Sequence, residues 1–259
     1  MQSERSRQQL LAVRRLRELV LDGTFKPGER VSEQACVDLL GISRTPVRLA
    51  LGALAHEGLL EAHVSGGFLV KRFSLDDILD AIELRGALEG MAAKFAAQRS
   101  SGKVATAKLR SILISIDELL DDTENQDDIF EGYVEQNERF HTEMLALAKC
   151  ELLERSLALI IALPFASPNS FVHIQSDVKH SRHVLMNGQF QHRCLVDAIE
   201  SGDAARAQNL GQEHARLAAG NLKHAMDTEQ LYVQVPGAQL IGIDGKDPAE
   251  LRLGRLRTN

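Results

Sequence analysis

The sequence predicts a mainly α-helical protein, with an N-terminal winged helix-turn-helix domain followed by an all-helical antiparallel bundle. Three observations predict this fold. Two short amphipathic helices meet at a glycine turn near residue 41, a glycine-centred hairpin follows them, and helical periodicity is almost unbroken from residue 74. At 259 residues, the chain is long enough for two modest domains. The expected parts are a winged-helix domain over 7–73, a helical domain over 74–227, and a tail over 228–259.

Composition and charge narrow the class of protein. No apolar run reaches the roughly 20 residues of a membrane span, and the polar start MQSERSRQQ lacks the apolar core of a signal peptide. Three widely spaced cysteines make no disulfide framework, so we expect a cytoplasmic protein with no membrane partner. Residues 1–73 hold 11 Lys or Arg and 8 Asp or Glu, a net charge of +3 that leaves −9 for the rest. A basic head on an acidic body favours a small DNA-binding module joined to a different domain.

The first half of the predicted winged helix carries clear start and stop signals. Residues 7–22 have the periodicity of an amphipathic helix, and Gly23 is placed to end it. Ser32 precedes the apolar-periodic run EQACVDLL, as an N-cap does, and Gly41 closes this second helix. After Gly58, the runs LLEAHV and FLVKRF flank a glycine-rich turn, which predicts a two-stranded wing.

The segment SRTPVRLAL contains a proline and still predicts a helix. With Ser43 as the N-cap, Pro46 is the third helical residue. The first four backbone N–H groups of a helix have no internal partner, so a proline there sacrifices no hydrogen bond. Pro46 therefore marks where the helix starts. Val47, Leu51 and Leu54 then fall on one inward face.

Two arginines and a threonine occupy the other side of this helix, near its N-terminus. The second helix of a helix-turn-helix places that end in the major groove, where Arg44 and Arg48 suit guanine O6 and N7 or phosphates, and Thr45 suits a phosphate or a base. The alternative for the arginines is a solvated helix face, and a winged helix can also serve only as a protein-interaction module. The complete order of three helices and a wing favours double-stranded DNA as the partner.

The run SEQACVDLLGISRTPVRLALGALAHEGLLEAHVSGGFLV closely resembles the winged-helix domain of GntR-type bacterial transcription regulators. The resemblance implies that the helix beginning at residue 44 reads operator DNA with help from the wing. This chain departs from the family in two places: members often carry a basic residue at the position of Gln34 and an arginine at that of Gly66. The candidate DNA-contacting residues are Gln34, Ser43, Arg44, Thr45, Arg48, Gly66 and Gly67.

The remainder of the chain is predicted to be helical. Ser74 and Asp77 have a spacing close to that of a capping box, which places a helix start there. Pro164 and Pro168 predict a break between helices in the segment LPFASPNS. The expected helices cover 75–99, 103–121, 127–148, 150–162, 170–187, 189–201 and 204–226.

Arg85 and Glu89 lie four residues apart on the first of these helices. Spacing alone favours a surface or intrahelical ion pair, which contributes a few tenths of a kcal/mol. The sharper alternative is a cavity arginine that binds an organic acid through its forked donors. Both interpretations stay open at this point.

Three histidines and an asparagine are candidates for a shared site. His192 lies ten residues before Gly202, and His214 lies eleven residues after Asp203. At a rise of about 1.5 Å per residue, two antiparallel helices place these imidazoles opposite each other. Asn137 and His141 share one face of a third helix and are able to reach the same point. Three imidazoles and an oxygen suit a divalent metal such as Zn, Ni or a Mn-like ion, but separately satisfied polar residues fit the spacing equally well.

The C-terminal body resembles the FadR-type effector domain, called FCD, of GntR regulators. The residues that carry this resemblance are LRGALEG, NERFH, and H-x9-G-D followed by Glu213-His214. The resemblance implies a helical bundle that dimerises and binds a small carboxylate, often through a divalent metal held by an aspartate and three histidines. Here Asn137 replaces the aspartate, which removes a charge and should weaken metal binding. The residues assigned to the effector are Arg85, Asn137, His141, His192 and His214, and the last four form the expected metal set.

Within the family, several details are most similar to VanR-type repressors of aromatic-acid catabolism. These details are SRTPVRLAL, DAIELRGALEG, the asparagine before FH, and LPFASP. They imply a homodimeric repressor that a vanillate-like acid releases from DNA. One alternative is a regulator that responds to the metal itself. A metal-dependent hydrolase is the other, but Glu138 and Glu213 lie on a different helix face from the histidines, and no nucleophile motif appears. We therefore expect no enzymatic activity.

Overall fold

The computed structural model describes residues 2–121, 126–163, 165–169, 178–227 and 237–242. They divide into two compact units. Unit 1 contains residues up to Ile78, together with residues 162–163 and 237–242, and unit 2 contains the described residues from Leu79 to Ile161 and from Phe165 to Asp227. The predicted fold class is confirmed: unit 1 is a winged helix-turn-helix and unit 2 is all-helical. No helix among the described residues is long and apolar enough to cross a bilayer.

Unit 1 is built on three helices: α1 (Gln2–Leu21), α2 (Glu33–Leu40) and α3 (Arg44–His56). The Ser32 hydroxyl accepts a 3.1 Å hydrogen bond from the Ala35 backbone N–H, and Gly41 ends α2 in a left-handed conformation with φ of 64°. This is the capping that the sequence predicted. The turn between α2 and α3 is short because both of its ends are fixed by these local signals.

Helix α3 begins where the serine and proline predicted. Ser43 has the extended backbone of an N-cap, although its hydroxyl makes no capping hydrogen bond, and Pro46 is the buried third residue of the helix. Val47, Leu51 and Leu54 are at most 1% exposed, so the inward face is the predicted one. The opposite face is therefore left to solvent.

A three-stranded antiparallel sheet forms the wing. Its strands are β2 (Leu60–Ala62) and β3 (Phe68–Val70), with β1 (Arg30–Val31) on the other edge of β3. A second, two-stranded sheet pairs β4 (Phe73–Ser74) in parallel with β5 (Ile241–Gly242).

The described part of the predicted tail packs into unit 1. A 3₁₀ turn over Ala238–Leu240 precedes β5, and Leu240 and Ile241 are fully buried. The Gln239 side chain donates to the backbone carbonyls of Val20 and Leu21 at the end of α1. The other predicted tail residues, 228–236 and 243–259, lie outside the described residues.

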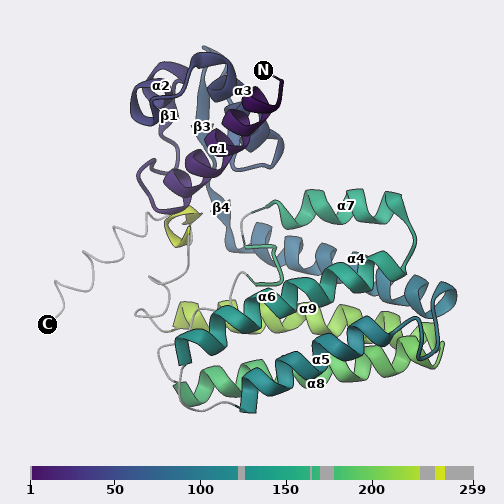
Figure 1. Ribbon diagram of the computed structural model, residues 1–259. Coiled ribbons are helices and arrows are strands. Elements are labelled where there is room, and N and C mark those ends of the chain that lie inside the picture. Colours follow the sequence, from purple (N-terminus) through teal and green to yellow (C-terminus); the bar gives the residue numbers. More distant parts are fainter. Residues whose placement is uncertain (1, 122–125, 164, 170–177, 228–236, 243–259) are drawn as a thin grey trace, which may run out of the picture. The chain divides into compact units, whose positions relative to one another are not determined.

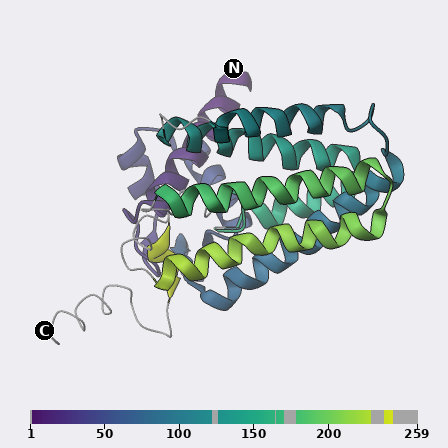
Figure 2. The ribbon, with the colours of Figure 1, turned by 90° about the horizontal axis from the view of Figure 1, so that it is seen from below.

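Six helices of the described chain make up unit 2. They run alongside one another in both views, and α8 and α9 form an antiparallel hairpin closed by Gly202 (Figures 1 and 2). The core between them is apolar and includes the buried Phe140, Met144 and Ile116. Their bounds are α4 (Leu75–Arg99), α5 (Ala107–Asp121), α6 (Gln126–Leu147), α7 (Glu151–Ile161), α8 (Val178–Glu200) and α9 (Ala204–Asp227). The predicted capping box is present, because Ser74 N–H donates to Asp77 Oδ2 and Asp77 N–H donates to Ser74 Oγ.

The predicted break at residue 188 is wrong. Gly188 lies inside α8, which runs unbroken from Val178 to Glu200. A Cβ on this glycine would lie 2.7 Å from the Tyr133 hydroxyl oxygen. The glycine is therefore explained by close packing of α8 against α6, and it does not end a helix. Residues 170–177, the start of the other predicted helix, lie outside the described part.

Glycines also set the distance between α4 and α9. A Cβ on Gly90 would lie 2.7 Å from the backbone oxygen of Gln208, and one on Gly211 would lie 2.9 Å from the Gly90 Cα. A Cβ on Gly86 would meet Ala215 at 3.0 Å. Because no side chain separates the two backbones here, Arg85 and Glu89 on α4 come within reach of groups on α9.

Candidate functional site

The predicted DNA-reading residues lie together on the exposed end of α3. Ser43, Arg44, Thr45 and Arg48 are all exposed, while the other side of the helix is buried. Their backbone N–H groups lie in the first turn or next to it, at the positive end of the helix dipole. This arrangement exposes hydroxyl and guanidinium groups that suit phosphates or base edges.

Gln34 on α2 orients one of these arginines. Arg44 Nη2 donates to Gln34 Oε1 over 2.6 Å, and Gln34 Nε2 donates to Asp38 Oδ1 over 2.7 Å. The resemblance to GntR-type regulators had implied a basic residue at the position of this glutamine. In this chain it instead holds the guanidinium of the neighbouring helix, so its contribution is to position Arg44.

The wing tip is held by an arginine that the sequence analysis did not single out. Gly66 and Gly67 have φ of 86° and 79°, a conformation that favours glycine. Arg30 on β1 donates to the Gly66 carbonyl from Nε and Nη2, and to the Ser65 carbonyl from Nη2, over 2.6 to 3.1 Å. The wing thus has a guanidinium at its tip although Gly66 itself carries no side chain. This contact could not be predicted from local sequence, because Arg30 lies 36 residues before Gly66.

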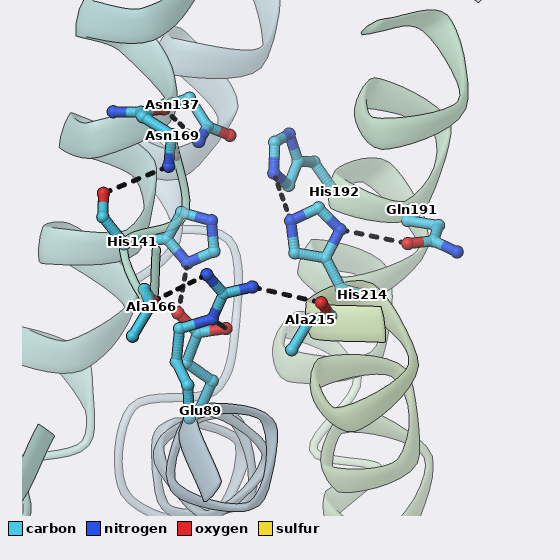
Figure 3. Close-up of polar contacts among 11 residues, drawn as sticks. Glu89, Asn137, His141, Ala166, Asn169, Gln191, His192, His214 and Ala215 are labelled. Atoms are coloured by element: carbon cyan, nitrogen blue, oxygen red, sulfur yellow. Dashed lines mark hydrogen bonds and ion pairs between the residues drawn. The ribbon is translucent and has the colours of Figure 1, made fainter. Parts of the chain in front are cut away.

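The three predicted histidines meet inside unit 2. His192 Nε2 and His214 Nε2 lie 3.0 Å apart, and the potential ligand atoms of these two residues and His141 all lie within 4.8 Å of one another. His141 comes from α6, His192 from α8 and His214 from α9 (Figure 3). His192 is fully buried and His141 is 8% exposed. Counting from the shared turn between α8 and α9 therefore placed two of these rings correctly opposite each other.

Glutamines fix the orientation of the facing pair. His214 Nδ1 lies 3.0 Å from Gln191 Oε1, and His192 Nδ1 lies 3.4 Å from Gln189 Oε1. A glutamine oxygen only accepts, so each contact by itself favours a proton on Nδ1, whereas the 3.0 Å contact between the two Nε2 atoms requires a proton on one of them unless a cation lies there. Both Nε2 atoms then face the centre of the cluster.

A buried charge pair from α4 lies beside the histidines. Arg85 is 2% exposed and Glu89 is 1% exposed, so the predicted intrahelical pair is present but lies in the interior and not at the surface, where the glycines of α4 allow close packing against α9. The two are separated by 3.8 Å, from Arg85 Nε to Glu89 Oε2. Arg85 also donates to the carbonyls of Ala166 and Ala215. Glu89 Oε1 lies 3.1 Å from His141 Nδ1 (Figure 3).

Asn137 stands one helical turn before His141 on α6 and is 3% exposed. Its amide Nδ2 donates to Asn169 Oδ1 over 2.8 Å, and Asn169 in turn donates to the Val134 carbonyl. With the nitrogen engaged in this way, the carbonyl oxygen is the atom of Asn137 left to act as a ligand. Asn169 lies in the break segment and was not predicted to belong to the site.

Two cavities adjoin the cluster. The first, of about 40 Å³, is lined by Arg85, Asn137 and His214 with Tyr133 and the apolar side chains of α8 and α9. The second, of about 180 Å³, lies against His141 and Glu89 and is lined mostly by apolar atoms, including those of Leu145 and Leu157. The first holds a few water molecules at most. The polar groups thus lie between a tight cavity and a larger, mostly apolar one.

Burial and neighbouring charges set the protonation states. Burial lowers the pKa of His214 to about 3, and burial together with the adjacent imidazoles lowers the pKa of His192 well below its usual value. Burial raises the pKa of the Glu89 carboxyl, but His141 and Arg85 outweigh it and bring that pKa to about 2. At neutral pH the site therefore offers two neutral imidazoles beside a carboxylate, which are the forms that bind a divalent cation.

A winged helix with an exposed basic reading end, joined in one chain to a helical unit with a buried polar site, defines a ligand-responsive DNA-binding regulator. Comparison with known proteins agrees. Residues 9–70 match the bacterial regulatory proteins of the gntR family, and residues 80–217 match the FCD domain. The chain belongs to the GntR family of transcription regulators that carry an FCD domain. The matched domains and relatives are regulators, and the chain is not an enzyme.

Individual relatives are similar over different lengths. The chain is 33% identical to the Nta operon transcriptional regulator of Aminobacter aminovorans over 137 residues, which cover 52% of this chain and 61% of that protein. It is 27% identical to a probable D-xylose utilization operon transcriptional repressor of Paenarthrobacter nicotinovorans, covering 75% and 80%. Among solved structures, E. coli McbR/YncC shares the fold, with a TM-score of 0.57, 19% identity, and 88% and 98% coverage.

Proposed function

We propose that this protein is a repressor that leaves its operator when a small organic acid binds in unit 2, with a divalent metal held by His141, His192 and His214. The observation that carries this proposal is the convergence of three imidazoles, two buried and one partly buried, beside Arg85 and a cavity, within an FCD domain. A carboxylate is the ligand that a metal and a guanidinium recognise together.

The residues present fit a metal. Two ligand nitrogens on adjacent corners of an octahedron with bonds of about 2.1 Å lie about 3.0 Å apart, which is the separation of the His192 and His214 Nε2 atoms. His141 Nε2 is buried and makes no hydrogen bond among the described residues. It faces the His192–His214 pair (Figure 3). Asn137 would add a neutral oxygen, and the metal would supply a positive charge that binds an anion.

The proposed effector is an aromatic or other largely apolar acid. The cavity beside Arg85 is too small for one, so the acid would have to open it toward the 180 Å³ cavity on the other side of His141. That second cavity is mostly apolar, which suits a ring, while Arg85 and the metal suit the carboxylate. A vanillate-like acid meets both requirements.

Operator binding would use two copies of the chain. The exposed face of α3 would enter the major groove, and a homodimer would place two such helices on a palindromic site one helical turn or more apart. Linkage requires the acid to bind the DNA-free geometry more tightly than the DNA-bound one. A dimer in light scattering and one dimer per palindrome in footprinting are the expected results.

The test measures binding of the purified protein to DNA from its own promoter region by fluorescence anisotropy, with and without a panel of benzoic and aliphatic acids. Release by an acid in the wild type, and no release in Arg85→Ala, is expected. If no acid in the panel weakens DNA binding while the protein binds DNA specifically, acid sensing is wrong.

A regulator that responds to the metal itself is the second candidate, because three converging imidazoles, two of them buried, are a strong ligand set. Metal analysis of the purified protein separates the two. Release of DNA by Zn²⁺ or Ni²⁺ alone would favour this candidate. An acid response that survives chelation would remove the metal from the mechanism.

A further inference from the structure

Asn137 leaves the proposed metal site without a carboxylate on α6, but a carboxylate reaches the cluster from another helix. Glu89 on α4 is 1% exposed, and its Oε1 lies 3.1 Å from His141 Nδ1. Close packing of Gly86 and Gly90 against α9 brings this part of α4 to the histidines. Glu89 therefore places a negative charge next to the site from which Asn137 has removed one.

The hydrogen bonding around Glu89 is incomplete. Neither carboxylate oxygen of Glu89 and neither ring nitrogen of His141 has a well-aligned hydrogen bond among the described residues, although two of these atoms are 3.1 Å apart. Buried charges without partners are costly. Arg85 compensates only in part, because it lies 3.8 Å away and directs its Nη atoms at backbone carbonyls. The arrangement is one that an additional cation would complete.

We propose that Glu89 is the positioning carboxylate of this metal site and supplies the charge that Asn137 lacks. Glu89 would accept the Nδ1–H of His141, which turns the lone pair of His141 Nε2 toward His192 and His214. A carboxylate behind a metal-binding imidazole fixes its tautomer and raises its basicity. The inference rests on the proposed metal site and adds the source of its negative charge.

The experiment titrates metal-free full-length protein with Co²⁺ and follows its visible absorption, with isothermal calorimetry for affinity. Glu89→Gln keeps the shape and removes the charge, and is expected to lower Co²⁺ affinity about 10- to 100-fold. Glu83→Gln is the matched control, since Glu83 is an exposed carboxylate on the same helix that pairs with Arg216. It should bind Co²⁺ as the wild type does.

A second pair of variants tests whether the carboxylate of Glu89 on α4 replaces one at position 137 on α6. Asn137→Asp restores a carboxylate on α6 and should raise the affinity. The double variant Asn137→Asp with Glu89→Gln should recover most of what Glu89→Gln lost. The gain from Asn137→Asp should be larger in the Glu89→Gln background than in the wild type, because one carboxylate then replaces the other. Equal gains in the two backgrounds would indicate a merely structural role of Glu89.

Wild-type affinity and an unchanged cobalt spectrum in Glu89→Gln would overturn the assignment of Glu89 while leaving the metal site intact. A wild-type protein that binds no Co²⁺, Zn²⁺ or Ni²⁺ would remove the metal site and Glu89's role together. If Glu89→Gln does not fold, Glu89→Asp decides, because it retracts the carboxylate from His141. Weaker binding supports the proposal, and binding equal to the wild type refutes it.

Discussion

The close approach of α4 and α9 at Gly90 predicts that a single methyl group there destabilises unit 2. A Cβ at this position would lie 2.7 Å from the Gln208 carbonyl oxygen and 2.8 Å from Gln212 Cγ. Favourable carbon–oxygen contacts lie at about 3.3 to 3.6 Å, so the helices would have to separate by about 0.6 to 0.9 Å. The carbonyl belongs to a helix backbone and cannot rotate away as a side chain would.

The magnitude follows from comparison with a second glycine. Gly220 lies inside α9, is exposed, and has nothing within 4 Å of an added Cβ. Replacing either glycine with alanine improves helix propensity by about 0.8–1.0 kcal/mol. Overpacking at Gly90 costs about 1–3 kcal/mol in addition. The propensity gain cancels in the comparison, so Gly90→Ala should be about 2 kcal/mol less stable than Gly220→Ala.

Urea denaturation followed by circular dichroism measures this difference. We expect Gly220→Ala to unfold at a higher urea concentration than the wild type, and Gly90→Ala at a lower one. The shift of α4 should also weaken whatever binds between Glu89 and His214. Surface substitutions typically change stability by no more than about 0.5 kcal/mol. If the two variants were equally stable within this range, the close contact between α4 and α9 at Gly90 would be refuted.

Three further predictions concern DNA binding and pH. Arg44→Ala should cost about 1–3 kcal/mol of operator affinity in anisotropy titrations. Arg14→Ala, which removes an exposed arginine of α1, should cost little. Equal losses would mean that Arg44 contributes only positive charge and does not contact a specific base. Arg30→Ala should weaken operator binding without lowering the melting temperature, because it frees the wing tip; undiminished affinity would mean that Arg30 does not position the wing. Hydrogen bonds from Ser74 lower the pKa of Asp77 from 3.8, so its contribution to stability is present above that pH and is lost as the pH falls through the lowered value. When the pH is lowered from about 5 to about 3, across the usual carboxyl pKa, Asp77→Asn should therefore lose less stability than the wild type. Identical profiles of unfolding free energy against pH for the two proteins would contradict this.

The reading helix was predictable because its signals are local. Ser43 and Pro46 fix the first turn of α3 by backbone geometry alone, and the apolar spacing of Val47 and Leu51 then decides which face is exposed. The paired histidines were predictable for a similar reason. His192 and His214 are counted from one turn, so an error in helix packing hardly changes their relative height.

The same local reasoning failed at Gly188, which is a contact surface for Tyr133 and not a helix end. Glycine breaks helices through its backbone freedom, but it also permits close packing, and the sequence around a single glycine does not distinguish these uses. Gly90 shows the point again, since its neighbours in the sequence are ordinary helix formers. What it contacts is set by α9, more than 100 residues later.

The burial of Glu89 and its contact with His141 could not be predicted from the sequence. Its neighbour four residues away, Arg85, makes a satisfactory surface pair on spacing alone, and nothing local indicates that both are buried. Burial changes their chemistry: an exposed pair contributes a few tenths of a kcal/mol, whereas a buried carboxylate needs a compensating positive charge. Arg85 gives part of that compensation, and His141 Nδ1 lies 3.1 Å from the carboxylate. If Glu89 supports the metal site as proposed, its carboxylate on α4 makes up for the neutral Asn137 on α6, and the asparagine is then compatible with metal binding.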